Sequence, residues 1–153
     1  MIASSGNFES GFSDAAKAIK AERVSARRHM NQLATFSIDP AIRELLSVWN
    51  NCRTPNWDGY GATSVSETTV RNAVALLEAL PLGWPLPSIG SEPDGHITLE
   101  WYQNPRQLLS VSIDENSSLY YAAILGNEDP RGTCRFDREV PETILYWIRR
   151  VLR

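Results

Sequence analysis

Four carboxylates that could act as metal ligands or general bases lie in two short stretches of the sequence. The first stretch is NWDGYGA at residues 56–62, and the second is EPDGHITLE at residues 92–100. The four carboxylates are Asp58, Glu92, Asp94 and Glu100. Carboxylate oxygens suit Mg²⁺ and Mn²⁺, which support metal-assisted hydrolysis. A fold that joined both stretches would predict a small metal-dependent hydrolase, with Asp58, Glu92 and Glu100 as catalytic residues and Asp94 as a further metal ligand.

The NWDGYGA stretch also has an architectural explanation. Gly59 and Gly61 can adopt positive φ angles and turn the chain tightly, and Asp58 can accept hydrogen bonds from nearby backbone N–H groups. The rings of Trp57 and Tyr60 can rest on the core, where each buries a large area. The stretch does not match a phosphate-binding loop, because no lysine follows it and a helix precedes it. We favour this explanation over a pocket lip in which Asp58 is a ligand or base.

The EPDG segment is typical of a hairpin corner, with Asp94 in the turn. Glu100, on the polar side of the next strand, is then a solvated or arginine-paired carboxylate. Zinc is a poorer match, since its sites are built largely from cysteine and histidine, and Cys52, Cys134 and the two histidines form no recognisable signature. We therefore expect reduced, packed thiols, no bound metal and no other cofactor.

Five tryptophans could suggest a groove for a sugar or a peptide. Trp49, Trp101 and Trp147 fall on the buried stripes of expected helices and strands, so core packing explains them. Trp84, in the GWPLP segment, is the tryptophan that we expect to be exposed as a contact ridge. If the protein acts by binding, its candidate contact residues are Trp57, Asp58, Tyr60, Trp84 and Glu100.

Helical periodicity predicts four helices around these residues. The first covers residues 13–33, and the second begins at Asp39 and Pro40 and ends near Cys52. The third begins at a capping-box pattern in residues 64–67 and stops at Pro81. The last begins near residue 141 and runs to the end of the sequence given.

Between the third and the last helix, apolar and polar residues alternate as they do in strands. The expected strands lie in PSIGSE, HITLEWY, LLSVSID, SLYYAAIL and GTCRF, and SLYYAAIL is apolar on both sides, which predicts a central strand. Short turns between them allow only antiparallel neighbours. We predict an α+β fold: N-terminal helices, a four- to five-stranded antiparallel meander sheet, and a C-terminal helix packed on one sheet face. The other face, with Thr98, Glu100, Ser110 and Ser112, should be polar.

Charge divides the chain at about residue 36. Residues 1–36 carry five basic and three acidic side chains, whereas residues 37–153 carry ten arginines and fifteen acids, a net charge of −5. We expect an N-terminal helical arm at 1–36 and a single α+β domain at 37–153. The arm's apolar stripe is thin, so it should pack on the domain, bind a partner, or pair with a second copy in a homodimer. An acidic domain is a poor match for a phosphate backbone, so nucleic acid is an unlikely partner.

Two motifs together resemble those of a group of small bacterial proteins of unknown function. The motifs are NWDGYGA at 56–62 and PSIGSEPDGHITLEWY at 87–102, followed by strands containing SVSI and YYA. The resemblance covers about residues 40–150. The resemblance supports the expected limits of the α+β domain, but it implies no activity or mechanism.

No catalytic signature outweighs the architectural explanations, so we favour a non-enzymatic interaction protein. It would be a regulatory, antitoxin-like or immunity-like partner of another protein, and its acidic surface suits a basic partner. The sequence has no apolar run long enough to span a bilayer and no secretory signal at its start, so we expect a cytoplasmic protein without membrane contact. The metal-dependent hydrolase remains the alternative.

Overall fold

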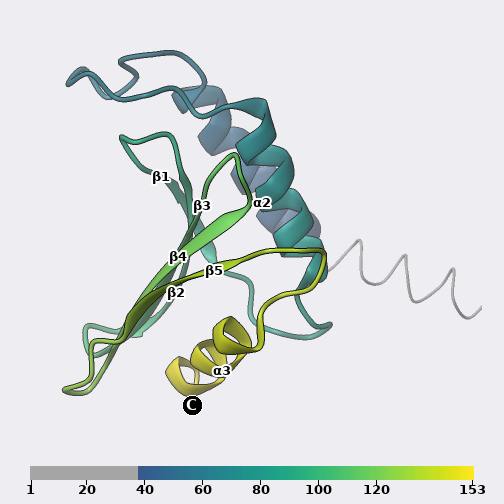
Figure 1. Ribbon diagram of the computed structural model, residues 1–153, viewed down its shortest axis with the longest axis vertical. Helices are drawn as coiled ribbons and strands as arrows, with labels where there is room; N and C mark the ends of the chain where they lie inside the picture. The colour runs from purple at the N-terminus through teal and green to yellow at the C-terminus, as the bar shows by residue number, and fades with distance from the viewer. Residues whose placement is uncertain (1–37) are drawn as a thin grey trace, which may run out of the picture. The chain divides into compact units, whose positions relative to one another are not determined.

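The computed structural model describes residues 38–153, in which helices cover one face of a five-stranded antiparallel sheet (Figure 1). The arm expected at residues 1–36, with its candidate dimerisation helix, lies outside the described residues. The predicted α+β class is confirmed, because helices precede the sheet and a helix follows it. No helix in residues 38–153 is long and apolar enough to cross a lipid bilayer.

The helices before the sheet follow the predicted pattern with one correction. The first described helix covers residues 38–52, and α2 covers Glu67–Ala79. The N-cap of α2 is Ser66, whose Oγ accepts a hydrogen bond from the N–H of Thr69 at 3.1 Å. The predicted capping box began two residues earlier. That start is wrong because Val65 is buried and gives its own N–H to the carbonyl of Cys52.

The sheet is a meander in which each strand pairs with the next one along the chain. Its strands are β1 Ser88–Ser91, β2 Ile97–Asn104, β3 Gln107–Ile113, β4 Ser118–Leu125 and β5 Arg131–Arg135. Leu99 lies opposite Val111, and Val111 lies opposite Tyr121, so these side chains share one face. The turns β1–β2 and β3–β4 lie at one end of the sheet, as a meander requires.

The core lies between the helices and one face of the sheet. α2 packs on β2 and β3, while α3, Glu142–Val151, packs on β2, β3 and β4. Figure 1 shows the sheet nearly edge-on with the helices on the same side of it. The fully buried side chains of the core come from both layers, and the largest are Leu45, Leu76, Leu77, Ile97, Leu99, Leu109, Ile113, Leu119, Ile144 and Ile148.

The other sheet face, which we call the open face, carries no described helix. It holds Thr98, Glu100, Ser110 and Ser112, as predicted. It is less polar than predicted, because Tyr102, Leu108 and Ile124 form a row across three strands. β4 lies between two strands as expected of SLYYAAIL, but no helix within residues 38–153 covers its outer side chains: Tyr120 is 41% exposed and Ile124 39%.

Two contacts fix the edges of the sheet. At β1, the Glu44 side chain from the 38–52 helix accepts a hydrogen bond from the N–H of Ile89 at 2.9 Å. At β5, the ring of Tyr121 lies across Gly132, where an added Cβ would be 2.5 Å from the Tyr121 hydroxyl oxygen. A side chain at position 132 would therefore displace this ring.

Candidate functional site

The 53–66 loop, which joins the 38–52 helix to α2, is held by hydrogen bonds among its own residues. Asp58 Oδ1 accepts the N–H groups of Tyr60 at 2.8 Å and Ala62 at 3.1 Å. Asn56 Oδ1 accepts the N–H of Gly61 at 2.7 Å, and the Asn56 N–H donates to the carbonyl of Ala62 at 2.8 Å. Asp58 is thus engaged in the architecture of the loop, as the favoured interpretation expected.

The glycines of this loop are needed for its path. Gly59 has a φ of +78° and Gly61 a φ of +91°, values that L-amino acids rarely adopt. Together with the turn at Asp58, they reverse the chain within a few residues. The loop therefore has a defined conformation that its own sequence sets.

The two aromatic residues of the loop have different surroundings. Trp57 is half-buried, packs against the core and donates its Nε1–H to the carbonyl of Thr63 at 3.0 Å. Tyr60 is 94% exposed. The expectation that the Tyr60 ring rests on the core is wrong, because Tyr60 lies between two glycines at the turn and meets no packing surface there.

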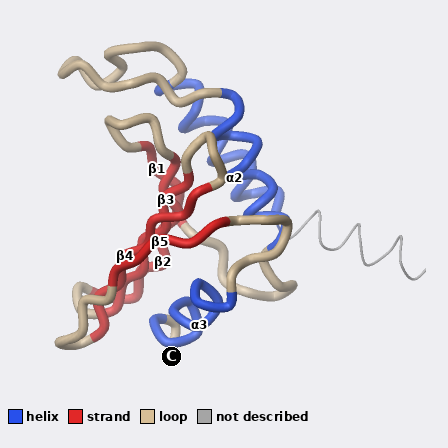
Figure 2. The backbone as a smooth tube through the Cα atoms, viewed as in Figure 1, coloured by secondary structure: helices blue, strands red, loops and turns tan. Residues whose placement is uncertain are grey.

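The loop is attached to the β1–β2 turn, residues 92–96. The N–H of Thr63 donates to the carbonyl of Pro93 at 2.8 Å. Gly95 has a φ of +90°, and an added Cβ there would lie 3.2 Å from the Ser64 carbonyl oxygen. Figure 2 shows the loop and this turn on the same side of the domain. The two motifs that the sequence analysis singled out are therefore neighbours.

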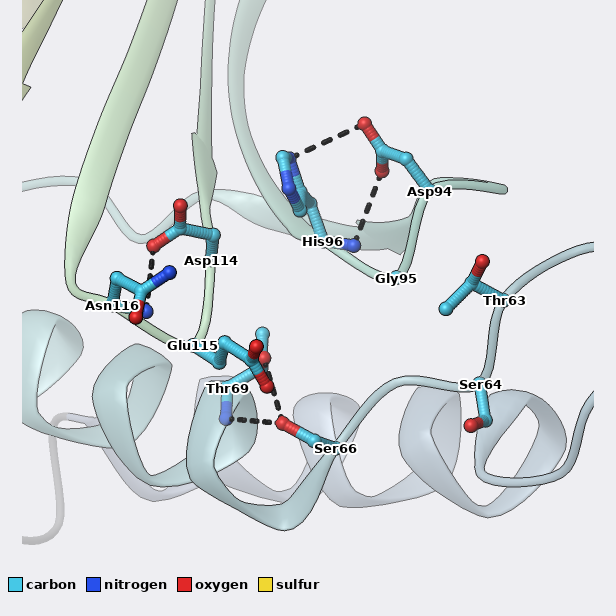
Figure 3. Close-up of a pocket in the computed structure, with 10 residues that line it drawn as sticks. All are labelled: Thr63, Ser64, Ser66, Thr69, Asp94, Gly95, His96, Asp114, Glu115 and Asn116. Atoms are coloured by element: carbon cyan, nitrogen blue, oxygen red, sulfur yellow. Dashed lines mark hydrogen bonds and ion pairs between the residues drawn. The ribbon is translucent and has the colours of Figure 1, made fainter.

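A polar cavity lies where the 53–66 loop, the start of α2, and the β1–β2 and β3–β4 turns meet (Figure 3). Its volume is about 180 Å³. It is lined by Thr63, Ser64, Ser66, Thr69, Asp94, Gly95, His96, Asp114, Glu115 and Asn116. Three of these residues carry a carboxylate and none is a lysine or an arginine, so the cavity favours a cationic or a neutral polar group.

Asp114 is the buried carboxylate of this cavity, with 8% exposure. Its Oδ1 accepts the N–H groups of Asn116 at 2.8 Å and Ser118 at 2.9 Å, and its Oδ2 accepts the Tyr120 hydroxyl at 3.2 Å. Burial raises the pKa of this carboxyl, but the hydrogen bonds and the positive charge available at His96 outweigh burial. They leave the pKa below its ordinary value of 3.8, so Asp114 is ionised at neutral pH.

His96 lies between the two turns and next to a carboxylate from each. Its ring stacks on Tyr120 with centroids 5.3 Å apart and planes 10° from parallel. His96 Nδ1 is 3.4 Å from Asp94 Oδ2, and the His96 side chain is 23% exposed. Close by on the open face, Glu92 Oε1 accepts hydrogen bonds from the hydroxyls of Thr98 and Ser112.

The four carboxylates considered for a metal site do not form one group. Among residues 38–153, three side chains bring ligand atoms within 4.8 Å of one another: Glu92, Asp94 and His96. Asp58 is not in this group, and Glu100 lies on the open face opposite Ser88 and Ser110. The hydrolase site built on Asp58, Glu92 and Glu100 therefore lacks the convergence that it requires.

Ion pairs on this domain leave the cavity carboxylates without an arginine partner. Five of the ten described arginines form ion pairs, with Asp39, Glu67, Glu128, Asp129 and Glu142. Within the described part of the chain, no arginine pairs with Asp58, Glu92, Asp94, Asp114 or Glu115. The end of the domain that carries the cavity, which we call the acidic end, thus has carboxylates that no described arginine pairs with.

Trp84 and the cysteines offer little chemistry. Trp84 is half-buried against the core and its ring is covered by the Arg149 guanidinium, 5.8 Å from the ring centroid. It is thus less exposed than expected. Both cysteines are free, and burial raises the pKa of the Cys52 and Cys134 thiols, which keeps them unreactive.

The sequence analysis did not single out Asp114, Tyr120 or the hydroxyl groups that line the cavity. One signal was available, because alternate turns of a meander meet at the same end of the sheet. This rule would have placed the Asp114 turn beside the His96 turn. The hydroxyl groups join them only because the 53–66 loop attaches to Pro93, and no sequence pattern indicates that contact.

No protein-family model, no curated protein and no solved structure matches this chain. The resemblance carried by the NWDGYGA and EPDG motifs stays a prediction. The function is therefore argued from the geometry and charge of the acidic end.

Proposed function

We propose that this protein is a non-enzymatic binding protein that recognises a basic partner protein at its acidic end. Tyr60 is the aromatic contact, and the carboxylates of the β1–β2 and β3–β4 turns supply the charge. A regulatory, antitoxin-like or immunity-like protein that masks a basic protein would act in this way. Two free thiols fit a reducing compartment such as the cytoplasm.

The observation that carries this proposal is the exposure of Tyr60 on an ordered loop. The side-chain oxygens of Asp58 and Asn56 accept hydrogen bonds from the N–H groups of Tyr60, Gly61 and Ala62, which fixes the backbone around Tyr60. A ring that is 94% exposed adds nothing to the core, so the loop's order does not serve packing at this position. Tyrosine is enriched in binding hot spots, and a preorganised loop loses little entropy when it binds.

The charge of the acidic end supports a basic partner. Asp94, Asp114 and Glu115 line the cavity, and no described arginine pairs with them. Complementary charge raises the rate of association and disfavours wrong partners. We therefore expect binding to weaken as salt is added, because exposed charges are screened over about 10 Å at 0.1 M ionic strength.

The alternative hydrolase has less support. It requires Asp58, Glu92 and Glu100 around one point, whereas Asp58 Oδ1 is bonded to two backbone N–H groups of its own loop. Glu92 Oε1 is bonded to two hydroxyls on the open face. These contacts indicate a structural role for Asp58 and Glu92.

The test uses the full chain as bait in a lysate of its source organism, followed by identification of the captured proteins. The Tyr60→Ala variant is compared with Tyr146→Ala. Tyr146 lies on α3, is 47% exposed and is far along the chain from the loop. We expect one basic protein to be captured by the wild type and by Tyr146→Ala and to be lost with Tyr60→Ala.

The same variants are then measured with the purified partner by calorimetry. Loss of a hot-spot aromatic weakens binding by about 2 kcal/mol or more, which is roughly 30-fold. Tyr146→Ala should bind as the wild type does. Equal affinity of Tyr60→Ala and the wild type, or an acidic partner, would contradict the proposal.

A further inference from the structure

We propose that Glu92, Asp94 and His96 bind a divalent first-row metal ion of the Zn²⁺ or Mn²⁺ class. The site lies in the β1–β2 turn and at the start of β2, beside the polar cavity. This inference does not rest on the partner binding proposed above, because it concerns a different ligand, although both proposals use the carboxylates of the β1–β2 turn.

The spacing of the ligand atoms fits a shared ion better than it fits a hydrogen bond. The 3.4 Å between His96 Nδ1 and Asp94 Oδ2 is longer than the roughly 2.7–3.2 Å of an N–H···O hydrogen bond. Two donors bound at about 2.1 Å to a tetrahedral ion lie about 3.4 Å apart. Glu92 brings a third ligand atom within 4.8 Å of the other two.

Two of the three side chains are held in place by neighbouring groups. The His96 ring stacks on Tyr120, which fixes its plane. Glu92 Oε1 accepts the hydroxyls of Thr98 and Ser112, which leaves Oε2 for an ion. Metal ligands in proteins are typically oriented by such outer contacts. The site therefore has part of the support that a metal centre needs before the ion arrives.

The imidazole of His96 distinguishes this group from an ordinary acidic surface patch, and it narrows the range of metal ions that the group would bind. Carboxylates alone suit Mg²⁺ and Ca²⁺, whereas a mixed set of one imidazole and two carboxylates suits Zn²⁺ or Mn²⁺. Asp94 has a 56% exposed side chain and His96 a 23% exposed one, so an ion can enter from solvent. No described arginine neutralises Glu92 or Asp94, so the ion would meet uncompensated negative charge.

The test is a calorimetric titration of the full chain, first freed of metal with a chelator, with ZnCl₂, MnCl₂ and MgCl₂. We expect one saturable site for Zn²⁺ or Mn²⁺ and at least tenfold weaker binding of Mg²⁺. Glu92→Gln and His96→Asn each remove one ligand and should weaken the binding at least tenfold. Glu100→Gln is the matched control, because Glu100 is a carboxylate on the same open face outside the group. It should bind within twofold of the wild type.

A thermal unfolding curve of each metal-free variant shows whether the variant is folded, so that a loss of metal binding is not mistaken for a loss of structure. Glutamine keeps an acceptor for Thr98 and Ser112, so Glu92→Gln should melt close to the wild type. If His96→Asn fails to fold, Asp94→Asn takes its place as the second ligand variant. Absence of saturable binding to the wild type, or equal loss in Glu100→Gln and Glu92→Gln, would overturn the proposal.

A spectroscopic measurement identifies the ligand atom. The chain has two histidines, so the imidazole nitrogen signals in a ¹⁵N NMR spectrum are few and can be assigned with His96→Asn. Zn²⁺ should shift the His96 nitrogens in proportion to the saturation measured by calorimetry. Unchanged His96 signals at saturating Zn²⁺ would show that the imidazole is not a ligand and would overturn the proposal.

Discussion

Asp58 sets the shape of the 53–66 loop through a single carboxylate oxygen. That oxygen accepts hydrogen bonds from the N–H groups of Tyr60 and Ala62. The two bonds fix the backbone at the exposed Tyr60 and across the glycine that follows it. A hydrogen bond to a charged group stabilises the folded state by about 1.5–3 kcal/mol, and this free energy is lost when the charged acceptor is removed and the donor stays unsatisfied. Tyr60 is exposed, so water can replace the bond that its N–H loses, whereas Ala62 is buried and its N–H has less access to water.

We expect Asp58→Ala to lower the free energy of unfolding by about 1–2 kcal/mol. Urea unfolding followed by circular dichroism measures the change. Asp58→Asn is the control, because its Oδ1 can still accept both bonds, and it should lie within about 0.5 kcal/mol of the wild type. Equal stability of Asp58→Ala and the wild type would contradict the role assigned to this oxygen.

Asp114 predicts a pH dependence whose sign follows from its lowered pKa. A carboxyl with a lower pKa in the folded state stabilises the protein fully above its unfolded pKa, and this contribution declines as the pH falls through the folded value. We expect Asp114→Asn to be less stable than the wild type by about 1–2 kcal/mol at pH 7. The difference should shrink as the pH falls below the ordinary value of 3.8.

Urea unfolding of both proteins at a series of pH values between neutral and strongly acidic conditions measures this difference. Glu115→Gln serves as the control, since Glu115 is the exposed neighbour of Asp114. Surface substitutions of this kind usually change stability by less than about 0.5 kcal/mol. A stability difference for Asp114→Asn that stays constant into the acidic range would contradict the lowered pKa.

At the scale of elements, much of the fold could be predicted because its signals are local. Alternation in HITLEWY and LLSVSID places Leu99 and Val111 on the same buried face, and the structure pairs them in β2 and β3. Pro81 likewise marks the end of α2, which stops at Ala79, through its own backbone chemistry. Such features depend on neighbours in sequence, so they can be read without the fold.

The site could be predicted only in part, because it depends on contacts between distant segments. The EPDG turn was recognised, but its link to the 53–66 loop is a backbone hydrogen bond from Thr63 to Pro93, which leaves no mark in side-chain types. Tyr60 shows a second limit. A tyrosine suits both a core and a surface, so only the path of the backbone decides its exposure.

Gly132 gives a prediction at the scale of the β4–β5 pair. An added Cβ would lie 2.5–2.8 Å from three atoms of the Tyr121 side chain, so the ring must move. We expect Gly132→Ala to lower the free energy of unfolding by about 1–3 kcal/mol, as overpacking does. Chemical denaturation measures the change.

Gly90 in β1 provides the matched control for Gly132→Ala. It is also a strand glycine, but nothing lies within 4 Å of an added Cβ. Gly90→Ala should therefore be neutral or slightly stabilising, within about 0.5 kcal/mol. Similar effects of the two substitutions would mean that the Tyr121 ring does not occupy the space above Gly132.

At the scale of the whole molecule, the described core lies within a single compact unit of the chain, residues 36–153. Its buried members run from Ala41 to Val151. We therefore expect a chain that lacks residues 1–35 to fold. Its urea unfolding should be one cooperative transition, with a free energy of unfolding in the range of about 5–15 kcal/mol that is usual for domains.

The full chain is the reference for the truncated one, and circular dichroism in the far and near ultraviolet compares the two. A truncated chain that shows helical signal but no cooperative transition would contradict a self-sufficient core. It would place part of the stabilising surface in the arm.

The contact between Glu44 and β1 limits how copies of this protein can join. Edge strands invite another chain to extend the sheet, but the Ile89 amide of β1 is already occupied by Glu44. At β5, a second copy pairing antiparallel about Thr133 would set Arg131 opposite Arg135, and like charges in that position repel. Both edge strands thus disfavour pairing with the edge of another copy. At high protein concentration, we therefore expect that no further strands add to the five-stranded sheet.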